Sequence, residues 1–301
     1  MNTKKAKKKS YLSLHLMLLL PVLLLVIYAY IPMGGVVIAF QDYKPLKGFI
    51  KSDWVGWKNF TMVFKNAYFS RALINTVIIA FWKIIVGQAF PILFALLLNE
   101  VRHSGAKRVA QTVVYMPYFI SWVLMAGILI NILSPSGGLI NNVIEAFGGK
   151  PIFFLGSKEL FRPVLVATDV LKNFGWGTII YMATLSGIDV TLYEAAMLDG
   201  AGRWKQALYV TLPSLAPTII MMFILSIGGI LNAGFEQVYN LMSAVTMETG
   251  DILDTLVYRL GMEQGQFSVS TAVGLFKSAV GLVLTIVSYK LAYKLTGYRA
   301  F

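Results

Sequence analysis

Long apolar runs alternate with short polar segments along most of the chain. A helix needs about 20 mostly apolar residues to cross the hydrocarbon core of a bilayer, because no water is present there to hydrogen-bond its backbone. Six runs meet this requirement: residues 14–39, 73–98, 110–133, 163–186, 214–233 and 270–295. The pattern therefore predicts an all-α integral membrane protein with six transmembrane helices.

The segments between these runs are polar or rich in glycine and proline, as in NEVRHSGAK and SPSGGLINN. The segment 41–71 differs, because Trp54, Trp57 and Phe60 lie among its six basic residues. We expect an amphipathic piece at the membrane interface there. Two parts follow: residues 1–70 hold a basic N-terminus, the first transmembrane helix and this outward-facing loop, and residues 71–301 form a transmembrane domain with helices two to six.

Composition agrees with a membrane protein. The 301 residues have a mean hydropathy of +0.70 and only 13% are charged, whereas about a quarter are charged in ordinary soluble domains. Cysteine is absent, and His15 and His103 are the two histidines, so we expect no disulfide and no metal site. The basic head MNTKKAKKKS precedes an apolar run too long for a cleaved signal peptide, which indicates a retained first span.

The positions of lysine and arginine predict the orientation. Dense clusters of these residues fall on the side of the N-terminus, and short cytoplasmic loops of membrane proteins carry such an excess. The members of these clusters are Lys4, Lys5, Lys7, Lys8, Lys9, Arg102, Lys107, Arg108, Arg203, Lys205, Lys290, Lys294 and Arg299. Both termini are therefore predicted to be cytoplasmic. The net charge of +12 mainly reflects this orientation, so we expect no nucleic-acid partner.

A polar stretch, YEAAMLDGAGRWKQALYVTLPSLAPT, interrupts the second half of the chain within the predicted cytoplasmic loop 187–213. Thr191 and Glu194 have the spacing of a capping box, so a helix is expected to begin there. The glycines of DGAG permit a bend, and a second short helix is expected to end at Pro213. Pro217 would then lie in the first turn of the fifth span. A bent helical hairpin outside the membrane follows, although an ordinary interfacial linker helix is the alternative.

The order of residues in this stretch resembles the EAA signature, E-A-A-x3-G-x9-I-x-L-P, of ABC importer permeases. The matching residues are Glu194, Ala195, Ala196, Gly200, Leu212 and Pro213, with Val210 in place of the isoleucine. Other segments, among them YIPMGGVVIAFQDYKP, YMPYFISWV and FGWGTIIYMATLSGID, look like the polysaccharide and oligosaccharide branch of these permeases, which is similar to the maltose-type permeases. Together the resemblance covers most of the chain from about residue 30 to residue 280.

The resemblance implies a type I importer fold with six transmembrane helices and a cytoplasmic coupling helix, in a bacterial plasma membrane. It implies a second, homologous permease as partner in a heterodimer, two ATP-binding cassette ATPases and an extracytoplasmic solute-binding protein. ATP and magnesium would be held by the ATPases, and this chain would bind no cofactor and would not itself be an enzyme. The cargo would be an oligosaccharide or a polysaccharide fragment.

The resemblance also assigns the loop 187–213 to contact with an ATPase. A short helix must approach the ATPase closely, and small residues permit this as they do between membrane helices. The predicted coupling residues are Glu194, Ala195, Ala196, Asp199, Gly200, Ala201, Leu212 and Pro213. The two acids could meet basic groups of the ATPase or cap the hairpin internally.

Charged and polar residues inside the spans are candidates for the cargo pathway, because they are costly in a membrane. Asp169 and Lys172 are three residues apart and could pair with each other. Sugars need aromatic faces for their rings, and amides or carboxylates for their hydroxyls. The candidates are Asn173, Trp176, Tyr181, Asn232, Phe235, Glu236, Gln237 and Lys277. Ordinary packing between helices or at the membrane interface is the alternative for each aromatic residue.

Other functions fit the sequence less well. A permease of the same type could carry another solute, such as a glycerol phosphate or a peptide-like molecule. An ion-coupled secondary transporter would need a chain of carboxylates within the membrane, and Asp169 alone is a poor candidate. A membrane enzyme is disfavoured because the chain contains neither G-x-S-x-G nor H-E-x-x-H, and it has no G-x4-G-K-[ST] phosphate loop for ATP hydrolysis.

Overall fold

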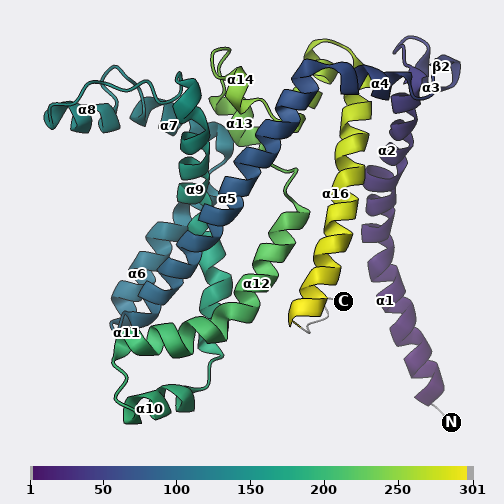
Figure 1. Ribbon diagram of the computed structural model, residues 1–301. Coiled ribbons are helices and arrows are strands. Elements are labelled where there is room, and N and C mark those ends of the chain that lie inside the picture. Colours follow the sequence, from purple (N-terminus) through teal and green to yellow (C-terminus); the bar gives the residue numbers. More distant parts are fainter. Residues whose placement is uncertain (1–2, 297–301) are drawn as a thin grey trace. The chain divides into compact units, whose positions relative to one another are not determined.

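The computed structural model describes residues 3–296, with side chains placed for residues 14–295. Helices dominate this part of the chain (Figure 1). Gln41–Asp42 (β1) pairs with Asp53–Trp54 (β2) in a short antiparallel ladder. The all-α expectation is therefore confirmed. The chain divides into two compact units, Met1–Lys65 with Leu260–Leu275, and Asn66–Arg259 with Phe276–Phe301.

The first unit begins with one long helical run. Its elements are α1 (Thr3–Leu25), η1 (Val26–Tyr30), α2 (Ile31–Met33), η2 (Gly34–Phe40), β1, α3 (Gly48–Lys51), β2, α4 (Lys58–Lys65) and, apart from its first residue, η5 (Arg259–Glu263), followed by the start of α16 (Phe267–Thr296). Residues Leu14–Phe40 form an apolar stretch of 27 residues, most of which are exposed, although Ala39 near its end is buried. Its surface is therefore available to lipid or to another subunit.

The end of this run is packed against the following loop by aromatic rings. The Phe40 ring lies 5.7 Å from that of Trp54, 5.5 Å from that of Trp57 and 5.3 Å from that of Phe60, centroid to centroid. The buried Asn59 amide donates to the carbonyls of Ala39 and Gln41, each at 2.9 Å. Aromatic packing and these two hydrogen bonds therefore hold β1, β2 and α4 against the helix end.

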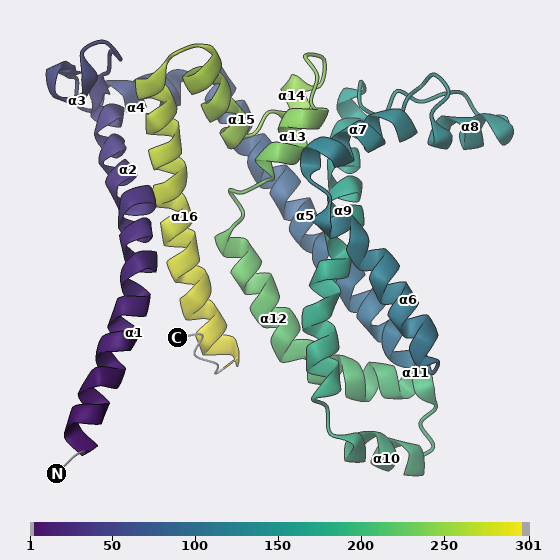
Figure 2. The ribbon, with the colours of Figure 1, turned by 180° about the vertical axis from the view of Figure 1, so that it is seen from behind.

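The second unit contains the remaining helices. They are α5 (Ala67–Glu100), α6 (Ser104–Tyr115), η3 (Met116–Phe119), α7 (Trp122–Ile132), α8 (Leu139–Ala146), α9 (Lys158–Ser186), α10 (Val190–Leu198), α11 (Arg203–Gln206), η4 (Ala207–Thr211), α12 (Leu212–Gly228), α13 (Phe235–Leu241), α14 (Met247–Gly250), α15 (Leu253–Tyr258) and the rest of α16. The long helices α5 and α9 pack against each other, as Figures 1 and 2 both show. Ile79, Phe161, Leu165 and Val238 lie at the centre of the main core.

The helices that are long and apolar enough to cross a membrane match the six predicted spans only in part. In the described residues four helices are long and apolar enough to cross a bilayer: Leu14–Phe40, Ala67–Glu100, Arg203–Gly228 and Phe267–Leu295. A fifth is possible if the pair Ser104–Phe119 and Trp122–Ile132, bent by 105°, counts as one span. The run 110–133 is therefore broken rather than straight, and the run 163–186 lies in α9, which is not among these helices.

Candidate translocation cavity and coupling loop

A polar cavity of about 320 Å³ lies among α5, α9 and the residues that follow α12. Its polar lining is formed by the side chains of Lys83, Gln88, Asp169, Asn173, Ser226 and Asn232. Three helices that lie in or near apolar runs thus turn polar groups toward one hollow. Such groups need water, protein or cargo as hydrogen-bond partners.

The cavity coincides with a break in a helix. Although the apolar pattern predicts a helix through residue 233, α12 ends at Gly228 and α13 starts only at Phe235. Gly234 has a φ of +94°, a conformation that glycine adopts without strain, and Gly229, Asn232 and Gly234 all line the cavity. Unwound backbone within a membrane is tolerated where it is buried in protein or lines a cavity, and transporter substrate sites often lie at such breaks.

One lysine connects the break to the two long helices. Lys83 Nζ lies 3.2 Å from Asp169 Oδ1, donates to the carbonyl of Ala233 at 2.7 Å and also donates to Gln237 Oε1. The Gln237 amide in turn donates to the Leu165 carbonyl of α9 at 2.8 Å. The ammonium group therefore satisfies an unwound carbonyl and links α5, α9 and α13. The pairing of Asp169 with Lys172, considered from the sequence, is wrong because Lys83 is the nearer partner.

Lys172 has a different role. Its Nζ donates to the carbonyls of Pro117 at 3.3 Å and Tyr118 at 2.7 Å, within η3, where the chain bends toward α7. Helix ends leave carbonyls without backbone partners, and a cation is favourable there. Lys172 therefore fixes the bent segment against α9.

Trp176 lies on the same face of α9 as Asp169 and Asn173, since positions three and four apart fall together on a helix. Its ring stacks on that of Tyr118, with centroids 4.5 Å apart and planes 4° from parallel. The Trp176 side chain nevertheless stays 46% exposed. It presents a broad aromatic surface, as the sugar-contact prediction requires, and contact with cargo stays a prediction.

Aromatic rings also cluster beyond the break. Phe235 stacks on Tyr239 at 5.4 Å, and Tyr239 meets Tyr258 edge to face at 4.8 Å. Glu236 of the same helix is exposed. The candidate cargo residues Phe235 and Glu236 thus lie beside these two tyrosines at α13.

The remaining candidates are engaged within the protein. Tyr181 is 2% exposed and its hydroxyl donates to Gln88 Oε1, Gln237 is fully buried, and Lys277 Nζ lies 2.5 Å from Asp254 Oδ1. In this conformation these three side chains position other groups, whereas Asn173 and Asn232 face the cavity directly. Gln88 and Ser226 were missed from the sequence, although a glutamine inside an apolar run is itself a signal.

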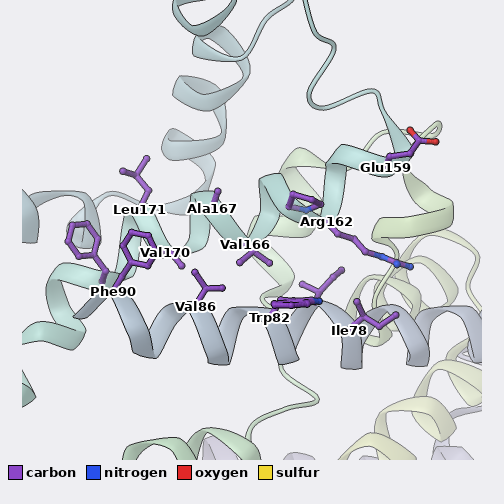
Figure 3. A pocket seen from close by; sticks show the side chains of 13 residues that line it. Ile78, Trp82, Val86, Phe90, Glu159, Arg162, Val166, Ala167, Val170 and Leu171 are labelled. Carbon is purple, nitrogen blue, oxygen red and sulfur yellow. The ribbon is translucent and has the colours of Figure 1, made fainter. Parts of the chain in front are cut away.

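A second hollow, of about 850 Å³, also lies along α5 and α9 but is almost entirely apolar. Figure 3 shows Trp82, Val86, Phe90 and Val166 among its lining, with the charged Arg162 and Glu159 at one end. Lipid tails or an apolar helix suit such a surface better than sugar hydroxyls do. The polar cavity is therefore the better cargo route.

The coupling loop contains the expected glycine bend. Gly200 follows α10 with a φ of +76°, and the amide of Ala201 donates to the carbonyl of Ala196 at 2.9 Å. This is the arrangement of a glycine helix cap, in which the left-handed residue lets the chain reverse. The bend predicted from DGAG is thus present.

Two details of the loop were predicted wrongly. Asp189 caps α10, because its Oδ1 accepts from the amide of Thr191 at 2.9 Å, and Thr191 therefore lies inside the helix rather than at its cap. This amide also lowers the pKa of the Asp189 carboxyl. Pro213 does not end a helix, since α11, η4 and α12 run on without a break. A π turn at Ala207–Thr211 precedes the proline, and such turns accommodate local irregularity in the backbone ladder.

The outer surface of the loop is open to a partner. Glu194, Ala195 and Asp199 are exposed, and Leu198 and Trp204 are 89% and 80% exposed. Within the described residues no ion pair engages Glu194 or Asp199. A cavity of about 470 Å³ lies between the loop and the end of α5. At this cavity Arg203 Nη1 lies 3.9 Å from Glu100 Oε2.

Comparisons with known proteins agree along nearly the whole chain. The family model described as binding-protein-dependent transport system inner membrane component matches residues 90–296. The polygalacturonan/rhamnogalacturonan transport system permease protein YteP of Bacillus subtilis (strain 168) is 44% identical over 298 residues, which cover 97% of this chain and 93% of that protein. Protein LplB of the same organism is 45% identical over 271 residues, 90% of this chain and 85% of LplB.

Solved structures of ABC transporter chains are also similar to this chain. A crystal structure of a bacterial ABC transporter involved in the import of the acidic polysaccharide alginate contains a chain that is 35% identical, with a TM-score of 0.88, and 98% of this chain and 100% of that chain are covered. A chain from the alginate transporter in complex with alginate pentasaccharide-bound periplasmic protein is 34% identical, also with a TM-score of 0.88, and both chains are covered in full.

Proposed function

Because the chain belongs to the binding-protein-dependent transport system inner membrane components, we propose that it is the membrane-spanning permease subunit of an ATP-driven importer of oligosaccharides. The resemblance seen in the sequence is thus confirmed. The names of YteP and of the alginate transporter favour uronate-rich polysaccharide fragments as the cargo.

The observation that carries the proposal is the polar cavity at the helix break. Side-chain amides of Gln88, Asn173 and Asn232 line it together with the Ser226 hydroxyl. Each amide can both donate and accept hydrogen bonds, and sugar hydroxyls do the same. A hydroxyl-rich molecule could therefore replace water in the cavity without leaving polar groups unpaired.

The length of α9 and the bonding of its charged side chains support α9 as a further membrane span. With the bent pair counted as one span, the total is six. Its 29 residues correspond to about 43 Å of helix. Its charged side chains are bonded within the protein: Asp169 to Lys83, Lys172 to backbone carbonyls and Arg162 to the Asn75 amide at 2.6 Å. Ionisable groups inside membranes are expected to be paired in this way.

The continuous helix Arg203–Gly228 supports a direct route for coupling. One end joins the exposed coupling loop, and the other ends where the polar cavity begins. Its 26 residues correspond to about 39 Å. A displacement of the loop by an ATPase would thus move the cavity wall without an intervening flexible segment.

The proposed assembly adds a second homologous permease, two ATPases that hold ATP and magnesium, and an extracytoplasmic binding protein. The alginate transporter solved with its periplasmic protein supports the last of these. Both termini and the coupling loop would face the cytoplasm of a bacterial cell, with the binding protein on the opposite side.

Reconstitution tests this function. Proteoliposomes that hold the permease pair and the ATPases should accumulate a labelled oligogalacturonide only when ATP is on the ATPase side and the binding protein is on the other. Uptake that persists without the ATPases, driven by an ion gradient, would reject the proposal.

A further inference from the structure

The loop that follows the first span is closed by hydrogen bonds of its own. We call residues 41–65 the hairpin module; it contains β1, α3, β2 and α4. The Lys47 backbone amide donates to the Lys44 carbonyl at 2.8 Å, Ser52 Oγ to the Gly48 carbonyl at 2.7 Å and Gln41 Nε2 to the Phe49 carbonyl at 2.9 Å. These hydrogen bonds hold the backbone of the module in its turn.

Four large apolar side chains of the module are exposed, although Phe60 is buried. Leu46 and Ile50 are 103% and 98% exposed, and Trp54 and Trp57 are 65% and 70% exposed. A loop in water would be expected to turn such side chains inward, because their hydration is unfavourable. The exposed surface therefore indicates a contact with an apolar environment.

The positive charge of the module indicates which apolar environment it contacts. Residues 41–65 hold five lysines and two aspartates, a net charge of +3, and both aspartates lie 3.6 Å from lysines of the module, Asp42 from Lys44 and Asp53 from Lys47. Lysines that surround exposed aliphatic and tryptophan side chains are typical of segments that lie at the surface of an anionic membrane.

Continuity with the first span places the module at the same interface. The apolar stretch ends at Phe40 and the module starts at the next residue. Trp54 stacks on Phe40 itself, and tryptophan is enriched where a span leaves the hydrocarbon core. The surface formed by Leu46, Ile50, Trp54 and Trp57 thus lies within reach of the lipid head groups.

We propose that the hairpin module is an interfacial anchor that inserts Leu46 and Ile50 into one leaflet of the membrane while its lysines bind anionic head groups. On the orientation proposed above this is the extracytoplasmic leaflet. The Tyr43 amide also donates to Ser268 Oγ at 2.9 Å, near the start of α16. The anchor would therefore fix the outer ends of the first and last spans in depth.

Fluorescence quenching in lipid nanodiscs tests this directly. Because the chain has no cysteine, Leu46→Cys and Ile50→Cys variants can each be labelled with one environment-sensitive dye before they are assembled into the full permease complex. Lys150→Cys is the matched control, since Lys150 is also exposed and follows α8, outside the hairpin module and the coupling loop. Brominated lipid chains should quench dyes at 46 and 50 at least about twofold more than at 150, and aqueous iodide should show the reverse order.

Two further comparisons complete the test. Quenching at 46 by brominated lipid should be stronger in anionic than in zwitterionic nanodiscs, and a Lys47→Gln, Lys51→Gln variant should lose this difference. Dyes at 46 and 50 that respond to iodide but not to brominated lipid would overturn the proposal. Shielding of these dyes only after addition of the binding protein would also overturn it and would assign the surface to that protein. None of these readouts requires transport, so failure of the anchor leaves the proposed function standing.

Discussion

At the scale of single residues, the ammonium group of Lys83 decides how the second unit is held together. It contacts Asp169 on α9 and the Ala233 carbonyl in the helix break. Removal of one partner from a buried ion pair leaves an uncompensated charge, which costs more than the pair itself contributes. The helix break and the polar cavity therefore both depend on this side chain.

Lys83→Met should lower the free energy of unfolding by about 3 kcal/mol, because Asp169 and the Ala233 carbonyl both lose their partner. Thermal unfolding of the purified permease in detergent measures this. Lys150→Met, at an exposed position, is the matched control and should be neutral. A Lys83→Met, Asp169→Asn double variant should recover part of the loss; equal melting temperatures for all four proteins would contradict the role given to Lys83.

Gly200 can be compared with its near neighbour Gly202. No atom lies within 4 Å of an added Cβ at either position, but Gly200 has a φ of +76° and Gly202 a φ of −68°. Gly200→Ala should therefore strain the loop by about 1 kcal/mol and reduce ATP-dependent uptake, whereas Gly202→Ala should be tolerated. Uptake that responds equally to both variants would show that backbone conformation is not the reason.

The hydrogen bond from Lys158 lowers the pKa of the Glu248 carboxyl, and the lysine charge adds to this. A carboxyl with a lowered pKa in the folded state contributes stability that is present above its ordinary value of 4.5. This stability is lost as the pH falls through the lowered pKa. Unfolding temperature measured from pH 7 to pH 3 should thus drop less in Lys158→Gln than in the wild type, and parallel curves would count against the pair.

At the scale of elements, sequence patterns predicted the features that depend on residues close together in the chain. Runs of apolar residues located the long helices, and the glycine of the coupling loop indicated its bend, because both depend on near neighbours in the chain. The break at 229–234 was not predicted. The Ala233 carbonyl within it accepts a hydrogen bond from Lys83, which lies 150 residues away in the sequence. The sequence likewise left open a pair between Asp169 and the nearby Lys172, whereas the ion pair is made with Lys83, which is distant in sequence.

The same limit applies to the helix that connects the coupling loop to the cavity. Pro213 reads locally as a stop signal, yet the preceding π turn lets the helix continue. Asp189 and Thr191 both suit a helix cap, and only the observed hydrogen bond distinguishes them. Patterns thus predicted the existence of the coupling helix, whereas its limits depend on backbone geometry.

If stiffness of the helix Arg203–Gly228 carries the coupling, glycines in its π turn should weaken transport. Leu208→Gly with Val210→Gly should reduce uptake severalfold while ATP hydrolysis persists, because each glycine costs about 1 kcal/mol of helix stability. Uptake and ATPase rates are measured in the same proteoliposomes. The matched control, Val109→Gly with Val113→Gly on the exposed face of α6, should leave their ratio unchanged; an equal loss in both variants would contradict the coupling route.

At the scale of the whole molecule, the second unit combines three properties that an importer subunit needs. It has helices long enough to cross a bilayer, a polar cavity at a helix break and an exposed coupling loop. The family match covers the residues that form most of these features. Which candidate residues line the cavity could not be predicted from sequence, because burial depends on the fold: Asn173 and Asn232 reach the cavity, whereas Tyr181 and Gln237 are buried.

The most direct test of the cavity as the cargo route is ATP-dependent uptake of an acidic oligosaccharide by the complete transporter with both cavity asparagines replaced. Asn173→Ala with Asn232→Ala should reduce uptake by about thirtyfold, because each lost hydrogen bond contributes about 1 kcal/mol and about 1.4 kcal/mol corresponds to a factor of ten. Assembly with the ATPases should stay intact, and Asn142→Ala at an exposed site should behave as the wild type. Unchanged uptake by the cavity variant would contradict the claim that cargo passes through this cavity.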